Sequence, residues 1–452
     1  MDTQELKFQQ MTQAPIPKLI GKLAVPCIIS MLVTSFYNMA DTFFVGMMDN
    51  TSATGAVGVV FSMMAIIQAV GFFFGHGSGN YISRELGKKN YDEASTMAAT
   101  GFFSSIMAGL LICIFGQIWL DELAYALGSS DTILPYTRDY LRVILLGAPW
   151  MAGSLVLNNQ LRYQGSAIYA MVGIVAGAGL NIILDPILIF GFDMEVMGAG
   201  WATIISQFVS FCILFVGCSK GSNIKIRFSK IRFRWFYFWM IIRGGLPSLA
   251  RQCLASFATI FLNRAAGGYG DAAIAAMGIV QRIMMFGASA MIGFGQGFQP
   301  VCGFNFGAGF HKRVKDGFWF CVKVSFLFLS GISVLLFIFA PEIISVVQRN
   351  DQDVIRYGAL ALRFQCITFP AQSWIIMSNM MEQSIGRTIP ATFLSAARQG
   401  VFFIPAIFIL TALFGLTGIQ ISQAAADLAT LLCAIPIHIY VLKTMSADKI
   451  AL

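Results

Sequence analysis

Long apolar runs, separated by short polar stretches, dominate the pattern of residues along the chain. A helix needs about 20 apolar residues to cross the hydrocarbon core of a bilayer. Twelve such segments can be marked out, at residues 22–47, 53–83, 94–120, 133–158, 168–192, 196–218, 240–268, 272–303, 314–340, 354–382, 390–414 and 418–443. The pattern predicts an all-α, polytopic membrane protein with twelve transmembrane helices.

The composition agrees with this interpretation. Of the 452 residues, 57% are hydrophobic and 12% are charged, whereas charged residues make up about 25% of a typical soluble domain. The net charge of +8 would suit a nucleic-acid-binding protein, but the basic residues lie in short loops between the apolar runs. Nucleic acid is therefore excluded as a partner, and membrane lipids are expected to surround the protein.

The charges of the loops alternate along the chain. Basic residues flank the first segment and follow the second, fourth, sixth, eighth, tenth and twelfth segments, whereas the other loops are mostly acidic, with Arg349 as an exception. Basic loops remain on the cytoplasmic side of a membrane. Residues 1–17 are polar and lack the apolar core of a signal peptide. We therefore expect both termini to be cytoplasmic.

The two halves of the chain repeat each other at an offset of 220 or 221 residues. The matching positions are Pro26 and Pro247, Gly58 and Gly278, Gly75 and Gly295, Gly77 and Gly297, and Gly87 and Gly307. The repeat predicts a six-helix N-terminal lobe at 1–218, a basic cytoplasmic linker at 219–238 and a six-helix C-terminal lobe at 239–452. Six helices per lobe make a parallel repeat, which typically encloses a cavity and alternates its opening. The linker is expected to contact anionic lipid headgroups.

An aspartate lies deep inside the first apolar segment. A carboxylate at membrane depth costs about 2.5–3.5 kcal/mol, so Asp41 is expected to face the protein interior and to have a function. The polar residues Thr34, Tyr37 and Asn38 precede it at helical spacing and share its face.

The fifth segment supplies a second acid. Asn181 and Asp185 are four residues apart and share one helix face, and Pro186 removes a backbone donor directly after them. Two carboxylates in one apolar pocket cannot both stay ionised cheaply, so the pair would bind a proton or a cation. Alternatively, Asp185 braces a broken helix near the outer face. The equivalent positions in the second half hold Leu262 and Ala406, so the shared fold does not require the acids.

Other polar and flexible residues are candidates for a supporting network or a substrate cavity. Asparagine and glutamine side chains in these segments, together with Thr203, would complete a hydrogen-bonded network around the acids. Such polar residues also hold transmembrane helices together without any further function. Methionines would suit a promiscuous pocket or ordinary packing. Two C-terminal arginines beside glutamines are expected to be buried, and either to pair between helices or to act on charged substrates. These candidates are Asn38, Gln68, Asn158, Thr203, Gln207, Met63, Met284, Arg282 and Arg398.

Four motifs resemble the MATE family of multidrug and toxin extrusion transporters, and its DinF-like branch in particular. They are YNMADTFFVG at 37–46, GSGNYISRELGK at 77–88, LNIILDPILIFG at 180–191 and GQGFQPVCGFNFGA at 295–308. The resemblance implies a two-lobe antiporter that exports amphipathic, often cationic drugs in exchange for H⁺ or Na⁺. We accordingly expect a monomer in a bacterial inner membrane, with no cofactor other than the coupling ion.

The resemblance also implies which residues bind that ion. In the DinF-like branch the site lies in the N-terminal lobe, and the matching residues are Asp41, Asn181, Asp185 and Thr203, with Tyr37 as a hydrogen-bond partner. Another branch uses acids of the seventh and tenth helices. Here the seventh segment has none and the tenth has only Glu382 at its end, so a second cation site is not expected.

Two other functions were weighed. A flippase for a lipid or a lipid-linked sugar would share the architecture, and it would need a lateral opening and a cationic cavity. The C-terminal arginines favour it, whereas the N-terminal acids favour an antiporter. No HExxH or GxSxG motif and no cluster of His or Cys is present in the sequence. We therefore expect that the protein is not an enzyme.

Overall fold

The computed structural model describes residues 3–47, 50–348 and 351–445, and these residues form helices and no strand. The long segments are α2 (Ile16–Gly46), α3 (Thr51–Gly87), α4 (Tyr91–Ile118), α6 (Leu134–Tyr163), α7 (Ala167–Pro186) continued by η1 (Ile187–Gly191), α8 (Glu195–Cys218), α9 (Trp235–Gly267), α10 (Asp271–Gly307), α11 (His311–Ile338), α13 (Gln352–Thr368) continued by η3 (Phe369–Ala371) and α14 (Gln372–Ile385), α15 (Thr388–Ala396) continued by η4 (Ala397–Val401) and α16 (Phe403–Phe414), and α17 (Leu416–Thr444). Shorter helices are α1 (Thr3–Gln13), α5 (Leu120–Ala126), η2 (Phe228–Lys230) and α12 (Ala340–Val347).

Each predicted segment corresponds to one of these long helical segments, and the all-α class is confirmed. Ten helices in the described ranges are long and apolar enough to cross a membrane. The seventh segment, α9, carries three arginines, and the tenth is divided by the turn Phe369–Ala371, which contains a proline. The first turn of α9 lies inside the predicted linker at 219–238.

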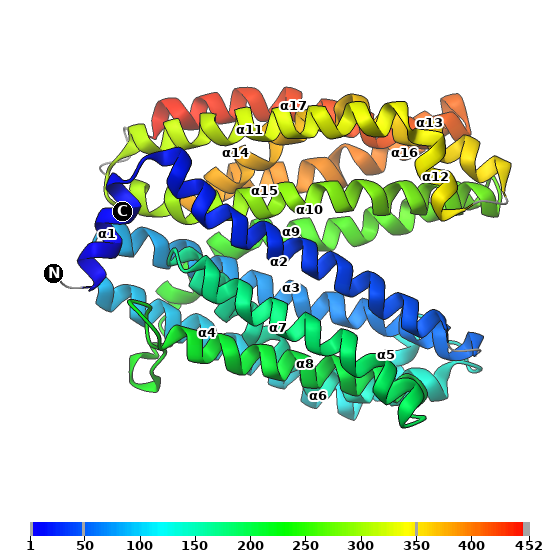
Figure 1. The fold of residues 1–452 in the computed structure, drawn as a ribbon, viewed down its shortest axis with the longest axis horizontal. Helices are drawn as coiled ribbons and strands as arrows, with labels where there is room; N and C mark the ends of the chain where they lie inside the picture. The colour runs from blue at the N-terminus through cyan, green and yellow to red at the C-terminus, as the bar shows by residue number, and fades with distance from the viewer. Residues whose placement is uncertain (1–2, 48–49, 349–350, 446–452) are drawn as a thin grey trace.

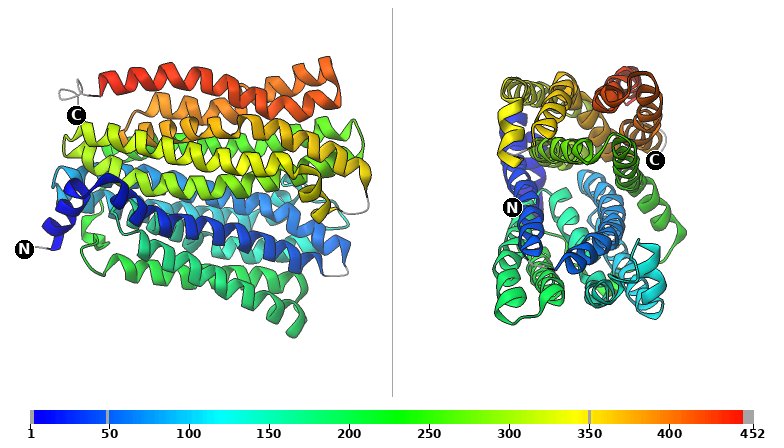
Figure 2. Two further views of the ribbon diagram at one scale, coloured as in Figure 1. Left: turned by 45° about the horizontal axis from the view of Figure 1, so that its top comes forward. Right: turned by 90° about the vertical axis from the view of Figure 1, so that its right-hand side faces the viewer.

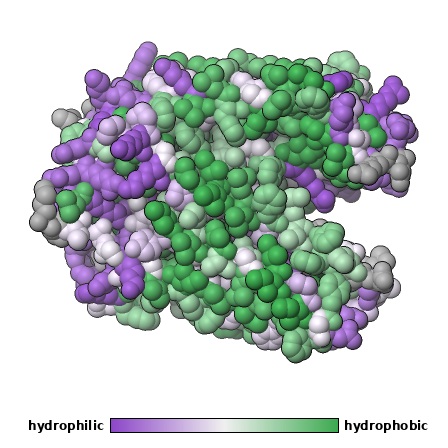
Figure 3. All heavy atoms as spheres, viewed as in Figure 1, coloured by the Kyte–Doolittle hydropathy of each residue, from purple (hydrophilic) through white to green (hydrophobic). Residues whose placement is uncertain are grey.

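The long helices run side by side along the long axis of the molecule (Figure 1), with α2–α8 on one side and most of α9–α17 on the other. The two termini lie at one end, whereas α5 and α12 lie at the opposite end (Figures 1 and 2). Hydrophobic side chains form a band across the middle of the visible face, and hydrophilic ones gather at both ends (Figure 3). A cleft separates the two halves at the end opposite the termini.

At the end that carries the termini, the two halves meet through the glycines of the repeat. A Cβ on Gly87 would lie 2.2 Å from the carbonyl oxygen of Phe304, and a Cβ on Gly307 would lie 2.1 Å from that of Arg84. The same reciprocal relation holds for Gly77 against Ile241 and for Gly297 against Ala24. Only glycine permits such a close approach of two backbones. The repeated glycines therefore form a symmetric seam, which we call the glycine seam.

Helix α1 lies across both halves at this end. Lys7 Nζ donates to Ser166 Oγ at 2.9 Å and to Asn223 Oδ1 at 3.0 Å in the first half. Asn305 Nδ2 of α10 donates to the carbonyl of Met11 at 3.0 Å in the second. Burial lowers the pKa of Lys7 to about 8, because the charged ammonium loses part of its hydration. This helix was not expected from the sequence, since its residues are mostly polar.

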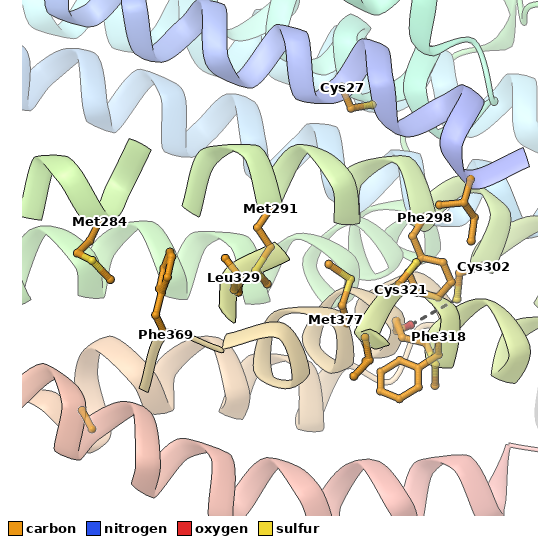
Figure 4. Packing of buried hydrophobic residues seen from close by; sticks show 14 of the residues in the cluster. Cys27, Met284, Met291, Phe298, Cys302, Phe318, Cys321, Leu329, Phe369 and Met377 are labelled. Atoms are coloured by element: carbon orange, nitrogen blue, oxygen red, sulfur yellow. Dashed lines mark hydrogen bonds between the residues drawn. The ribbon is translucent and has the colours of Figure 1, made fainter. Parts of the chain in front are cut away.

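A core rich in sulfur and aromatic side chains joins α10, α11 and α14, and Figure 4 shows Met284, Phe298 and Phe318 within it. Met284 is 8% exposed there. Met63 is 5% exposed and packs in a separate core of the first half. Both methionines pack within hydrophobic cores, which agrees with ordinary packing, the other of the two roles considered for them. Deformable thioethers also fill irregular gaps between helices.

Candidate cation-coupling site

The two predicted acids lie together at the packing of α2, α7 and α8. Asp41 comes from α2 and Asp185 from α7, and their carboxylates are within electrostatic range of each other. Asp185 is completely buried. Because α2 packs on α7 and α7 packs on α8, side chains far apart in the sequence share one environment.

Asn181 connects Asp185 with α8. Its Nδ2 lies 3.4 Å from Asp185 Oδ1 and 3.5 Å from Thr203 Oγ1. With the amide turned over, Asn181 donates to Asp185 Oδ2 at 3.0 Å and accepts from the backbone N–H of Thr203 at 3.3 Å. The amide donates to the carboxylate in either orientation. Tyr37 lies one turn before Asp41 and is within electrostatic range of both acids.

The acid pair has no cationic partner among the residues that the structure describes. Neither carboxylate makes an ion pair with Lys, Arg or His within the described residues, and Asp41 Oδ1 is buried with no hydrogen-bond partner among them. A buried carboxylate oxygen without a partner is costly. A proton or a small cation would neutralise the pair and satisfy this atom.

Asp185 stands where the regular helix ends. Helix α7 ends at Pro186 and continues as the π-helical turn Ile187–Gly191, in which Phe192 N donates to the carbonyl of Ile187 at 2.9 Å. Proline removes an N–H from the helical ladder, and single π-helical turns are frequent at functional sites. The break predicted at Pro186 is therefore present, and Asp185 is the last residue before it.

A cavity of about 1140 Å³, part of it open to solvent, lies beside the acid pair. Six of the predicted residues line it, namely Tyr37, Asn38, Gln68, Asn158, Asn181 and Gln207. Asp41, Asp185 and Thr203 are not part of its wall. Because Asn181 belongs both to the wall and to the acid cluster, it links the cavity with the two carboxylates.

One charged residue of the cavity, Arg162, was not expected there from the sequence. Arg162 lines the cavity and is 3% exposed, although the fourth segment was expected to end at residue 158 and to leave this arginine in a cytoplasmic loop. Helix α6 in fact continues to Tyr163. The run of polar residues at 158–160, which continues the helical pattern, is the signal that could have revealed the longer helix.

The two predicted C-terminal arginines differ in their surroundings. Arg282 is exposed, so the expectation that it is buried is wrong; its position on α10 turns it away from the packed face. Arg398 donates from Nε to Asp427 Oδ1 at 2.8 Å. Gln372 Nε2 donates to the other carboxylate oxygen at 3.0 Å. Of the two roles considered for Arg398, the structure shows pairing between helices.

The profile of the MatE family matches residues 26–187 and 247–409. The chain belongs to the MatE family. The second match begins 221 residues after the first, which is the offset of the internal repeat. Membership confirms the resemblance found in the sequence, and it identifies a multi-pass membrane protein that is not an enzyme.

Individual relatives cover almost the whole chain. Multidrug export protein MepA of Staphylococcus aureus (strain MSSA476) is 30% identical over 438 residues, which are 95% of each chain. MepA of Staphylococcus haemolyticus (strain JCSC1435) is 28% identical over 443 residues, or 97% of each chain. A solved structure described as the outward-facing conformation of a multidrug resistance MATE family transporter superposes with a TM-score of 0.91 at 25% identity, covering 97% of this chain and 98% of that one.

Proposed function

We propose that this MatE protein is a secondary active antiporter, which exports amphipathic, mostly cationic compounds in exchange for H⁺ or Na⁺. The observation that carries the proposal is the Asp41–Asp185 pair, in which Asp185 is fully buried and one oxygen of Asp41 is buried without a hydrogen-bond partner among the described residues. The pair has no cationic partner among those residues and lies beside a cavity. The names of the staphylococcal relatives support export of several drugs. We place the protein in a bacterial inner membrane with both termini in the cytoplasm.

Transport then follows from exchange of the two ligands. With cytoplasmic termini, the cleft of Figure 3 faces outward. The compound leaves through this cleft, and an ion from outside neutralises Asp41 and Asp185. Neutralisation favours the return of the protein to the opposite opening, provided that ion and compound differ in affinity for the two states.

Helix α2 connects the acid site with the other half of the molecule. It carries Asp41 and Tyr37 on one face, and Ser35 Oγ lies 3.0 Å from Ser289 Oγ of α10. Gln296 Nε2 of α10 also lies 3.6 Å from Met31 Sδ. A shift of α2 on ion binding would therefore act directly on the contact between the halves.

Everted membrane vesicles test the proposal and identify the ion. Vesicles that contain the protein take up a fluorescent cationic dye while either a pH gradient or a sodium gradient is imposed, and vesicles without the protein serve as the control. We expect uptake that is driven by one gradient and abolished when that gradient is dissipated. Uptake that ignores both gradients would contradict the proposed antiport.

A further inference from the structure

Arg162 brings a positive charge without an acidic partner among the described residues into the wall of the cavity, where its guanidinium lies 5.5 Å from the centre of the Tyr163 ring. One terminal nitrogen donates to Asn159 Oδ1 at 2.6 Å and lies 3.3 Å from His76 Nε2. Its Nε is buried without a hydrogen-bond partner, and no carboxylate pairs with it within the described residues. A guanidinium buried in this way requires a negative partner.

The neighbouring histidine does not supply that partner. A guanidinium only donates hydrogen bonds, so Nε2 of His76 has to accept from Arg162. The ring proton is then on Nδ1, which lies 3.1 Å from the carbonyl of Phe72 and donates to it. His76 is therefore neutral in this arrangement, and the charge of Arg162 remains.

A second arginine comes from the other half. Arg251 of α9 lies within electrostatic range of Arg162, His76 and Tyr163, and it makes no ion pair within the described part of the chain. Two guanidinium groups from opposite halves are thus within electrostatic range of each other, and neither pairs with an acid within the described residues. Their mutual repulsion is relieved if an anion binds there.

One end of the cavity is basic, and the other end lies next to the acid pair, which is outside its wall. Along α2 its wall runs from Cys27, which is within electrostatic range of Arg162, to Asn38, which precedes Asp41 by three residues. Eleven residues of helix span about 16 Å. The middle of the wall is partly apolar, with Met31 and Leu155. A ligand that lies along α2 therefore meets the basic end at Arg162, a partly apolar middle and a polar end at Asn38 and Asn181, next to the acid pair.

We propose that Arg162, supported by Arg251, binds an anionic group of an amphipathic substrate, such as a carboxylate, a sulfonate or a phosphate. The substrate class includes zwitterions, whose cationic part lies towards Asp41 and Asp185. This inference deepens the proposed export function and rests on it. Arginine suits the role because its planar group donates two parallel hydrogen bonds to such anions.

Two dyes of nearly identical shape provide the test. Rhodamine 110 carries a free carboxylic acid and is zwitterionic when ionised, whereas rhodamine 123 is its methyl ester and is a cation. Binding to the full-length protein in phosphatidylcholine nanodiscs is measured by fluorescence anisotropy. We expect Arg162→Gln to weaken the Kd of the free acid by about tenfold or more and that of the ester by less than about twofold. Retained ester binding shows that the variant is folded.

Three further variants sharpen the result. Arg162→Lys keeps the charge without the planar fork and should lose only part of the affinity for the free acid. Arg251→Gln should weaken free-acid binding less than Arg162→Gln. Arg243→Gln is the matched control, because Arg243 is exposed and does not line the cavity, and it should change neither Kd. A free acid that fails to bind the wild type, or an equal loss for both dyes in Arg162→Gln, would overturn the subsite.

Gradient-driven transport separates this inference from the proposed function. If vesicles transport the ester under an ion gradient while Arg162→Gln leaves the Kd of the free acid unchanged, the antiport is supported and the anion subsite is refuted. If neither dye is exported while Arg162→Gln selectively loses the free acid, the subsite stands and the antiport fails. Nanodiscs that contain the anionic lipid phosphatidylglycerol identify the source of the anion. If this lipid weakens binding of the free acid to the wild type, the subsite accepts a lipid headgroup. If Arg162-dependent binding of the free acid is undiminished, the subsite accepts a soluble amphiphile.

Discussion

Buried acids occur in both halves of the molecule, and the Asp41–Asp185 pair differs from the others in its partners. Glu85 of the first half is 5% exposed and pairs with Lys88 at 2.9 Å, and the two buried acids of the second half also have ionisable partners. Asp427 is 2% exposed and accepts a hydrogen bond from Arg398 at 2.8 Å. Glu382 is fully buried, and its Oε1 lies 3.2 Å from His438 Nδ1. In each case a side chain of the protein shares the charge or the proton of the carboxylate.

The acid pair of the first half lacks such a partner within the described residues. Asp41 and Asp185 are within electrostatic range of each other, and Asp185 lies beside the amide of Asn181. One oxygen of Asp41, like Oε2 of Glu382, has no hydrogen-bond partner among the described residues. A carboxylate with a permanent partner supports the structure, whereas one without a partner has to take a mobile ion. The comparison therefore separates acids that hold helices together from acids suited to coupling.

Loss of Asp41 should have the largest effect. Asp41→Asn removes one ionisable group from the pair, so ion-driven efflux of a cationic dye should be abolished while membrane insertion is retained. Efflux is measured in everted vesicles under the driving gradient. Asp193→Asn replaces an exposed loop acid and is the matched control, for which normal efflux is expected. Undiminished efflux by Asp41→Asn would refute the coupling role.

Substitutions in the glycine seam test whether the two halves contribute equally to the contact between them. Gly87→Ala and Gly307→Ala each place a methyl group against a backbone carbonyl that cannot move aside. Each should cost about 1–3 kcal/mol of stability and separate the halves at the end that carries the termini. Maleimide labelling of Cys302, which is fully buried, should increase similarly in both variants.

A second repeated pair of glycines supplies the control for this experiment. A Cβ on Gly58 or on Gly278 would meet nothing within 4 Å. Gly58→Ala and Gly278→Ala should therefore leave the labelling of Cys302 unchanged. A strong effect of only one seam variant would contradict the symmetry of the seam.

Breaking the pair in the second half should affect stability more than transport. Arg398→Gln leaves Asp427 buried with only glutamine donors and should cost about 1–3 kcal/mol, since Arg398 is partly exposed. The double variant with Asp427→Asn should recover most of this loss. Melting temperatures in detergent measure both, and Arg282→Gln, which changes an exposed arginine, should be neutral. Equal melting temperatures of Arg398→Gln and wild type would show that the pair contributes little.

The smallest effect is expected for Glu382. Glu382→Gln keeps the shape of the side chain beside His438, so ion-driven efflux should stay within about twofold of wild type if this acid takes no part in coupling. The measurement is the same vesicle assay under the same gradient. Abolished efflux would show that an acid of the second half also couples, and the contrast between the halves would fail.

The sequence alone determined the long apolar helices, the repeat and the residues that share a helix face. These features depend on local periodicity and composition, which a single chain displays directly. Tyr37, Asn38 and Asp41 belong to one face of α2 whatever the packing, and Asn181 and Asp185 to one face of α7. The repeated glycines were visible as an offset before their contacts were known.

Only the tertiary structure decided what each buried charge meets. Arg282 and Arg398 look alike in the sequence, yet one is exposed and the other pairs with Asp427. Arg162 resembled a loop residue and is instead buried in the wall of the cavity. The physical reason is that the partner of a charge lies on another helix, and the rotation and neighbours of that helix are set by packing of the whole bundle.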